Sequence, residues 1–279
     1  MRLFINHCHV APAGTFSKDN PKKGALELLK AMMDSHGIEK AVAFAPFLHC
    51  MPADVEYRIF CKTEWECNEW LYRELKKFQG IFGFVTVNPK NPACAAILTE
   101  FVGKGFVGVK MHPPVFQARV DDPAFDAYYF TIERLGVPIL FHMGSHGWQP
   151  EEYRPSRLGN VARRHPQLRI IIEHMGGTEG FREALEVLVK NENCYAGITS
   201  TLNQTIEGGR PNASYLTPEM FRELLQSVSS QRIIYGTDYP FNFPEDIVNE
   251  IKTIQSMAIG DEDKRNILGG TLETLCLGT

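Results

Sequence analysis

The sequence predicts an α/β protein built as a single (β/α)8 TIM barrel, in which eight parallel strands alternate with helices. Three observations lead to this prediction. Eight short apolar segments recur along the 279 residues, and segments with the apolar spacing of helices lie between them. The links that follow the apolar segments are often longer than the links that precede them. Composition marks no linker, so we expect one domain over residues 1–279.

The eight predicted strands are mostly continuous runs rich in Val, Ile, Phe and Leu, which is typical of parallel strands that are covered on both faces. They are residues 2–5, 40–46, 80–87, 106–111, 137–142, 168–174, 193–199 and 232–237. Helical spacing appears in the intervening residues 25–33, 95–104, 180–190 and 218–228. About 10 residues follow the second strand, about 12 the fifth and roughly 20 the seventh. In a barrel these long loops lie at the C-terminal ends of the strands, where we expect the functional site.

Composition excludes several classes of function. The formal net charge is −4 and the pI is about 6.2, so the chain lacks the basic surplus that attracts nucleic acid. No apolar stretch approaches the roughly 18 residues of a membrane span, and the first residues are too polar for a signal peptide. We therefore expect a cytoplasmic protein with no nucleic-acid or membrane partner. The seven cysteines are scattered without a Cys-x-x-Cys pair, which favours reduced thiols.

Polar residues stand where several of the apolar strands end. They are His7, His9, Lys110, His142, His174 and Asp238. Because side chains alternate along a strand, His7 and His9 share one face and Cys8 points to the other. The C-terminal ends of the strands meet at one end of a barrel, so these side chains are expected to converge there.

A cluster of imidazoles with a carboxylate suits a divalent metal ion, because catalytic zinc takes about three His or carboxylate ligands. His-x-His alone is a weak motif, and a buried histidine can instead be a core residue bonded to a carbonyl. Asp238 can instead form an Asx turn before Pro240. A carboxylate that ends an apolar strand is costly to bury without a cation or several donors, which favours the metal interpretation.

Five motifs, taken in order, resemble the amidohydrolase superfamily, and specifically the metal-dependent hydrolases and decarboxylases related to aminocarboxymuconate semialdehyde decarboxylase. The motifs are INHCHV, GFVGVKMHPP, GVPILFHMG, IIIEHMGG and IIYGTDYPF, and the resemblance spans nearly the whole chain. It implies a barrel of the metal-dependent hydrolase type. It also implies one divalent metal ion as cofactor, with zinc preferred and manganese or iron as alternatives.

The resemblance also assigns roles to individual residues. It implies His7, His9, His142 and Asp238 as metal ligands, with His174 beside them to activate water or polarise the substrate. An Asp238 that also accepts a proton from water would serve as the general base. The chain departs from the family at Asn6, where many members carry Asp, and we expect the lost charge to weaken metal binding.

Substrate contacts are predicted at Lys110, His112, His146 and Trp148. Lys110 is either a carboxylated lysine that bridges two metal ions, as in some branches of the superfamily, or an ammonium group that binds a substrate carboxylate or pairs with a buried acid. His112 shares a strand face with Lys110 if the strand extends that far. His146 and Trp148 follow the fifth strand, and His146 can equally be a solvated loop residue. Further loop candidates for contact with a cyclic or aromatic acid are Phe47, Arg154, Asn203, Arg210 and Tyr239.

These residues predict a metal-dependent hydrolase that acts on a small-molecule ester, lactone or amide through activated water. One alternative is a metal-dependent nonoxidative decarboxylase of a cyclic or aromatic carboxylic acid, because fold and ligands do not fix the reaction. A second alternative is a metal-free barrel with a binding role. The short chain favours the hydrolase, since the decarboxylases that it resembles usually carry more loop material. Relatives of this kind commonly form homodimers or homotetramers, so either assembly is expected.

Overall fold

A computed structural model describes residues 2–17, 19–48, 61–144, 148–206, 209–242 and 244–278. Within these residues the main sheet has nine parallel strands in the order β10-β7-β6-β5-β4-β3-β2-β1-β11, and a separate hairpin is formed by β8 and β9. The strands are β1 (Leu3–His9), β2 (Ile38–Phe44), β3 (Ile81–Thr86), β4 (Gly108–Met111), β5 (Ile139–His142), β6 (Ile170–Glu173), β7 (Cys194–Gly197), β8 (Thr205–Ile206), β9 (Arg210–Pro211), β10 (Ile233–Ile234) and β11 (Gly236–Tyr239).

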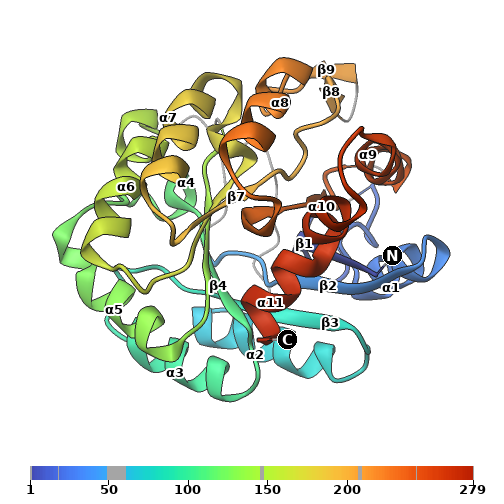
Figure 1. Ribbon diagram of the computed structural model, residues 1–279. Coiled ribbons are helices and arrows are strands. Elements are labelled where there is room, and N and C mark those ends of the chain that lie inside the picture. Colours follow the sequence, from blue (N-terminus) through green and yellow to red (C-terminus); the bar gives the residue numbers. More distant parts are fainter. Residues whose placement is uncertain are drawn as a thin grey trace.

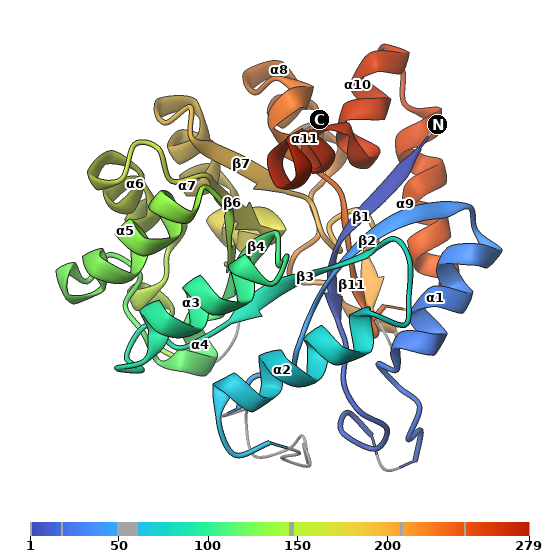
Figure 2. The same cartoon turned by 90° about the horizontal axis from the view of Figure 1, so that it is seen from below.

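Helices surround this sheet, as Figures 1 and 2 show from two directions. They are α1 (Leu26–Ser35), α2 (Glu64–Leu75), α3 (Cys94–Gly103), α4 (Pro113–Phe116), α5 (Asp126–Leu135), α6 (Pro155–Arg164), α7 (Gly177–Lys190), α8 (Pro218–Ser227), α9 (Pro244–Ser256), α10 (Asp261–Arg265) and α11 (Thr271–Leu277). The prediction of a single α/β TIM barrel is therefore confirmed. Within the described residues, no helix combines the length and the apolar character needed to cross a membrane.

The predicted eighth strand is divided into two pieces, which is a difference from the expected continuous strand. Ile233 and Ile234 of β10 pair with β7, whereas β11 pairs with β1. Between the two pieces, the backbone N–H of Tyr235 donates to the carbonyl of Ile267, outside the sheet. The eighth strand thus pairs with β7 before Tyr235 and with β1 after it.

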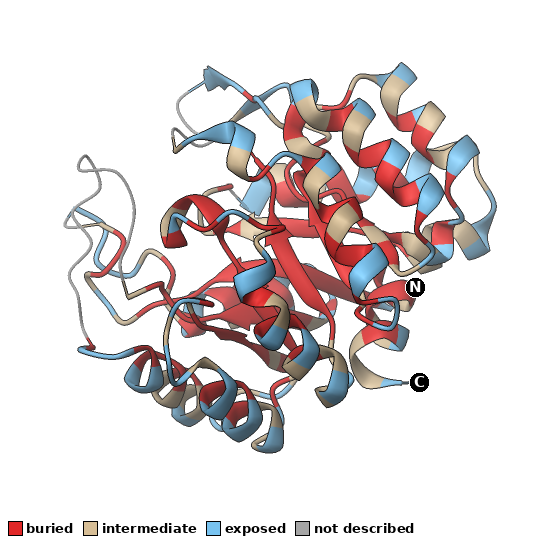
Figure 3. Ribbon diagram, turned by 90° about the vertical axis from the view of Figure 1, so that its left-hand side faces the viewer, coloured by how far each residue is buried: buried red, intermediate tan, exposed pale blue. Residues whose placement is uncertain are grey.

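Side chains inside the barrel belong to one apolar cluster, and side chains between the strands and the helices belong to another. The inner cluster contains Phe4, Val42, Phe44, Phe84, Leu140, Ile171 and Ile234, together with Leu272 and Leu275 of α11. Their neighbours along the strands, such as Ile5, Ala41, Phe141 and Ile172, belong to the outer cluster. This alternation is the period of two that strands impose. Figure 3 shows the result, with buried strands in the centre and exposed outer faces on the helices.

One expectation about the cysteines is wrong. Cys61 and Cys67 form a disulfide, whereas Cys8, Cys94, Cys194 and Cys276 are free and Cys50 lies outside the described residues. The first turn of α2, capped by the Thr63 side chain, brings the Cα atoms of Cys61 and Cys67 to 5.8 Å, which is within the range that a disulfide spans. A spacing of six residues is no recognised disulfide signature, so the pattern gave no sign of it.

A buried carboxylate on α9 links that helix to the barrel. Glu250 accepts hydrogen bonds from the backbone N–H of Leu202, at 3.1 Å, and from the Tyr235 hydroxyl, at 3.2 Å. Burial raises the pKa of Glu250 to about 8, against the opposing effect of these two hydrogen bonds. The protonated acid is therefore the form that folding favours.

We expect Glu250→Gln to make stability less dependent on pH. The pKa of Glu250 is higher in the folded state than in the unfolded state, so its contribution is fully present below pH 4.5 and is lost as pH rises through about 8. Between these limits the wild type should lose up to about 1.4 kcal/mol per pH unit relative to the variant. Urea unfolding of both proteins from pH 4.5 to pH 8.5 measures this difference. Parallel stability curves would contradict it.

Candidate metal and catalytic site

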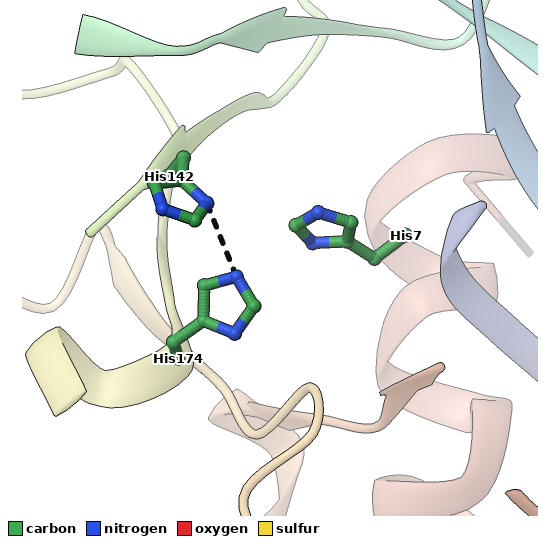
Figure 4. Close-up of side chains that lie close together, drawn as sticks. All are labelled: His7, His142 and His174. Atoms are coloured by element: carbon green, nitrogen blue, oxygen red, sulfur yellow. Dashed lines mark hydrogen bonds between the residues drawn. The ribbon is translucent and has the colours of Figure 1, made fainter. Parts of the chain in front are cut away.

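The histidines and the aspartate singled out in the sequence lie together at the C-terminal ends of their strands. His7 and His9 end β1, His142 ends β5, His174 directly follows β6, and Asp238 lies in β11. Figure 4 shows His7, His142 and His174 directed toward one another from three separate elements. The expected convergence of these side chains is therefore what the geometry shows.

Three of these residues have left-handed backbones, which non-glycine residues rarely adopt. The φ angles are 63° at His7, 56° at His174 and 56° at Asp238. Such a conformation costs about 1–3 kcal/mol per residue and persists only where the surrounding structure enforces it, so a cluster of three is typical of a functional site.

The left-handed residues also change which side chains face inward. Phe4 belongs to the inner cluster, and Ile5 and Cys8 belong to the outer one. The pairing of β1 with its neighbours shifts register around His7, which forms a bulge, and Asn6 and His7 both face the barrel interior as a result. His174 has the same effect after β6, because Glu173 and His174 both lie in the interior although they are consecutive.

The donor atoms form two overlapping groups within the described residues. His7, His142 and His174 make one group and His7, His9 and Asp238 the other, and the ligand atoms within each group lie within 4.8 Å of one another. Asp238 Oδ1 is 3.4 Å from His9 Nε2 and 3.5 Å from His7 Nε2. His7 is thus the residue that both groups share.

The chemistry of this donor set fits a divalent cation. The Nδ1–H of His174 donates to the Thr199 carbonyl at 2.9 Å, so a neutral His174 has a lone pair on Nε2. That atom faces His142 Nδ1 at 3.2 Å, and Nε2 of His7 faces Nε2 of His9 at 3.2 Å. Ring nitrogens at this distance need a proton or a cation between them. Nitrogen donors with one carboxylate are the ligands of catalytic zinc and related transition metals.

Electrostatics keep His7 and Asp238 in the protonation states that bind metal. Burial lowers the pKa of His7 well below its usual value, and the nearby charges of Lys110 and His174 lower it further, so the imidazole is neutral. Burial alone would raise the pKa of Asp238. The hydrogen bond with His9 and the charges of His174 and His9 outweigh burial and lower that pKa, so the carboxylate is ionised.

Lys110 lies inside the site rather than at its rim. Its Nζ is 3.1 Å from His7 Nε2 and lies over the Phe44 ring, 4.9 Å from the centroid. Burial lowers the pKa of Lys110, against the opposing charges of Glu173 and Asp238. Its role in substrate binding, and its carboxylation, stay predictions.

Some of the other predicted substrate residues pack against His142 or against its neighbour His112, and others contact residues outside the histidine cluster. His112 stacks on His142 with ring centroids 4.1 Å apart, and Phe47 packs edge-on against His112 at 5.1 Å. Trp148 instead stacks on Tyr153 in the loop after β5. Arg154 bonds Glu183, Asn203 bonds the Asp246 carbonyl, Tyr239 bonds the Ala25 carbonyl, and Arg210 lies in the exposed strand β9. His146 lies outside the described residues.

A cavity of about 340 Å³ lies beside the histidines. The loops after β5 and β6 line it, with Met143, Gly144, Tyr153, Gly176 and Thr178 among the lining residues. Gly144 leaves room for the His142 ring, because a Cβ at this position would lie 2.9 Å from His142 Nε2. The cavity therefore adjoins the side of the site formed by His142 and His174.

Sequence reasoning missed Glu173, which is completely buried beside the candidate ligands. Its Oε2 accepts a hydrogen bond from Asn6 Nδ2 at 3.1 Å, and its Oε1 accepts one from the Thr199 hydroxyl. Burial raises the pKa of Glu173, and the neighbouring Lys110 opposes that rise. The signal was a glutamate directly after three isoleucines of an apolar strand, where burial needs a partner. A carboxyl group, which many members are expected to carry at the position of Asn6, is thus present beside Asn6, on β6.

Known proteins share both the sequence pattern and the fold. A model of a family described as amidohydrolase matches residues 6–272. Among solved structures, 2,6-dihydroxybenzoate decarboxylase from Rhizobium is 17% identical with a TM-score of 0.72, over 99% of this chain and 98% of that one. A dihydroxybenzoic acid decarboxylase from Polaromonas with bound manganese and the inhibitor 2-nitroresorcinol is 16% identical with a TM-score of 0.71, over 98% and 96%.

A structure named as a probable hydrolase has the same fold. It is a probable 2-pyrone-4,6-dicarboxylic acid hydrolase from Acinetobacter baumannii with citric acid bound, 15% identical with a TM-score of 0.64, over 99% of each chain. At these identities the three structures share the fold with this chain, and their names include both decarboxylases and a hydrolase.

Proposed function

The chain belongs to the amidohydrolase family, and from this premise we propose that it is a metal-dependent hydrolase of a small-molecule ester, lactone or amide. One observation carries the choice of hydrolysis. The ionised carboxylate of Asp238 lies against two imidazoles at the end of the barrel, where a base for water activation is needed.

In this proposal His7, His9, His142 and Asp238 hold one divalent metal ion, with zinc preferred and manganese or iron as alternatives by donor type. A bound metal ion would supply Lewis acidity, which acidifies water and polarises a carbonyl group. Asp238 accepts a proton from the attacking water and passes it to the leaving group. His174 donates its Nδ1–H to the Thr199 carbonyl and has its Nε2 3.2 Å from His142 Nδ1, and from this place beside the ligands it activates water or polarises the substrate.

Decarboxylation of a cyclic or aromatic carboxylic acid is the second candidate. The buried side chain of Lys110 beside His7 supports it, because an ammonium group at this position would suit a substrate carboxylate. Two of the structures with this fold are named as decarboxylases of dihydroxybenzoic acids. The alignment covers 98% of the Rhizobium enzyme, so chain length does not favour a hydrolase as we expected.

Metal removal tests the proposed cofactor. Dialysis against a chelator should lower activity at least about 100-fold, because Lewis acid assistance contributes several kcal/mol, and added zinc, manganese or iron should restore it. Elemental analysis of protein purified without chelator should find about one metal ion per chain. Absence of metal, with no activity after metal is added, would instead support a barrel with a binding role.

A substrate screen separates the two reactions. Lactones, esters and amides are assayed for acid release, and aromatic carboxylic acids are assayed for CO2 release, with the same metal-loaded protein. We expect acid release from at least one lactone, ester or amide. Turnover confined to CO2 release would overturn the hydrolase proposal in favour of the decarboxylase.

A further inference from the structure

Glu173 has no part in the mechanism above, although it is a fully buried carboxylate next to a candidate ligand. Its Oε2 lies 3.4 Å from Nδ1 of His7. That nitrogen is buried and makes no hydrogen bond of normal geometry within the described part of the chain. The other ring nitrogen, Nε2, faces His9 and Asp238. Glu173 therefore stands on the side of the imidazole opposite the candidate metal position.

The surroundings of Glu173 hold its carboxylate in place. The Thr199 hydroxyl donates to Oε1 and the Asn6 amide donates to Oε2, so hydrogen bonds fix both oxygens. Gly197 of β7 leaves the space that the carboxylate occupies, because a Cβ there would lie 2.5 Å from Glu173 Oε1. Residues of β1, of β7 and of the segment directly after β7 thus shape one position for this side chain.

Two residues with left-handed backbone conformations make this arrangement possible. The left-handed His7 lets Asn6 and His7 face inward together, and the left-handed His174 does the same for Glu173 and His174. Strict alternation along a strand would place one residue of each pair outside the barrel.

We propose that Glu173 is a positioning residue, which accepts a hydrogen bond from Nδ1–H of His7 and so directs Nε2 of His7 to the metal ion. This inference rests on the proposed metal site. Histidines that bind metals usually donate their other N–H to a carboxylate, carbonyl or water, and the loss of such a partner typically lowers metal affinity 10–100-fold.

Zn²⁺ affinity, measured by competition with a chelator, tests the proposal. Glu173→Gln removes the charge, and Glu173→Asp keeps the charge but withdraws it by one methylene. Both should bind Zn²⁺ about 10–100-fold more weakly than the wild type. Glu250→Gln is the matched control, because it neutralises another buried glutamate that contacts Leu202 and Tyr235 instead of a histidine, and it should bind Zn²⁺ like the wild type.

A swapped pair separates positioning from packing. The double variant N6D/E173Q exchanges the carboxylate and the amide across the Asn6–Glu173 hydrogen bond and keeps the total charge. We expect it to unfold closer to the wild-type temperature than E173Q while its Zn²⁺ affinity stays low, because the carboxylate has left Nδ1 of His7. In metal-free protein, imidazole ¹⁵N shifts of His7 should show a proton on Nδ1 in the wild type and a mixture of tautomers in E173Q.

Each outcome decides a different point. Wild-type affinity in E173Q and E173D, or affinity restored by the swap, overturns the positioning role and leaves the proposed function intact. A wild type that binds no Zn²⁺ overturns the proposed function, and this inference with it. If E173Q fails to fold at 25 °C, the His7 tautomer in metal-free E173D still decides, since Nδ1–H unchanged from the wild type would contradict the proposal.

Discussion

Replacing His7 by alanine is expected to abolish metal binding and to lower the catalytic rate at least about 10³-fold. His7 is the residue shared by both groups of candidate ligands, so its loss leaves two donors in each group. A metal ion contributes several kcal/mol of transition-state stabilisation, and about 4 kcal/mol corresponds to a factor of about 10³. Elemental analysis and turnover of the substrate found by the screen measure the two effects.

His36→Ala is the matched control for that variant, because His36 is an exposed histidine at the end of α1. It should keep the metal content and the rate of the wild type. Alanine keeps a Cβ and does not relieve the left-handed conformation at this position, so circular dichroism must first show that the variant is folded. Full metal content in a folded His7→Ala protein would show that His7 is no ligand, and it would remove the basis of the proposed site.

The barrel and the convergence of the histidines were predictable because they depend on regular patterns. Apolar runs such as Ile170–Glu173 mark strands by composition, and the period of two places His7 and His9 on one side. Parallel strands in a barrel then carry their C-terminal residues to one end. Neither step needs knowledge of contacts between distant residues.

The features that were missed depend on such contacts. Histidine enters the left-handed region more often than most non-glycine residues but still uncommonly, so the surrounding structure holds His7 and His174 there and turns Asn6 and Glu173 inward. The stacking of Trp148 on Tyr153 was not predicted, and the role of Trp148 in substrate contact stays a prediction. The Cys61–Cys67 disulfide likewise depends on how the chain enters α2. Local spacing contains none of this information.

The second large effect is expected for Asp238→Asn. Asparagine has nearly the same shape but remains neutral, so it cannot serve as the base that the ionised carboxylate provides. We expect kcat to fall about 10²–10⁴-fold at saturating metal, which is the range for loss of a general base. Metal affinity should fall as well but not vanish, because His7, His9 and His142 remain as nitrogen donors. Assays across a range of metal concentrations separate the two effects.

Asp121→Asn provides the comparison for Asp238→Asn. Asp121 is also a buried aspartate, but it bonds Arg119, Arg157 and Asn160 on the outside of the barrel. Its replacement should lower stability and leave kcat at the wild-type value, because none of these partners touches the histidines. A loss of kcat confined to Asp238→Asn, persisting when every site holds metal, assigns the proton transfer to this carboxylate. A metal-saturated Asp238→Asn enzyme that works at more than half the wild-type rate would mean that another group is the base.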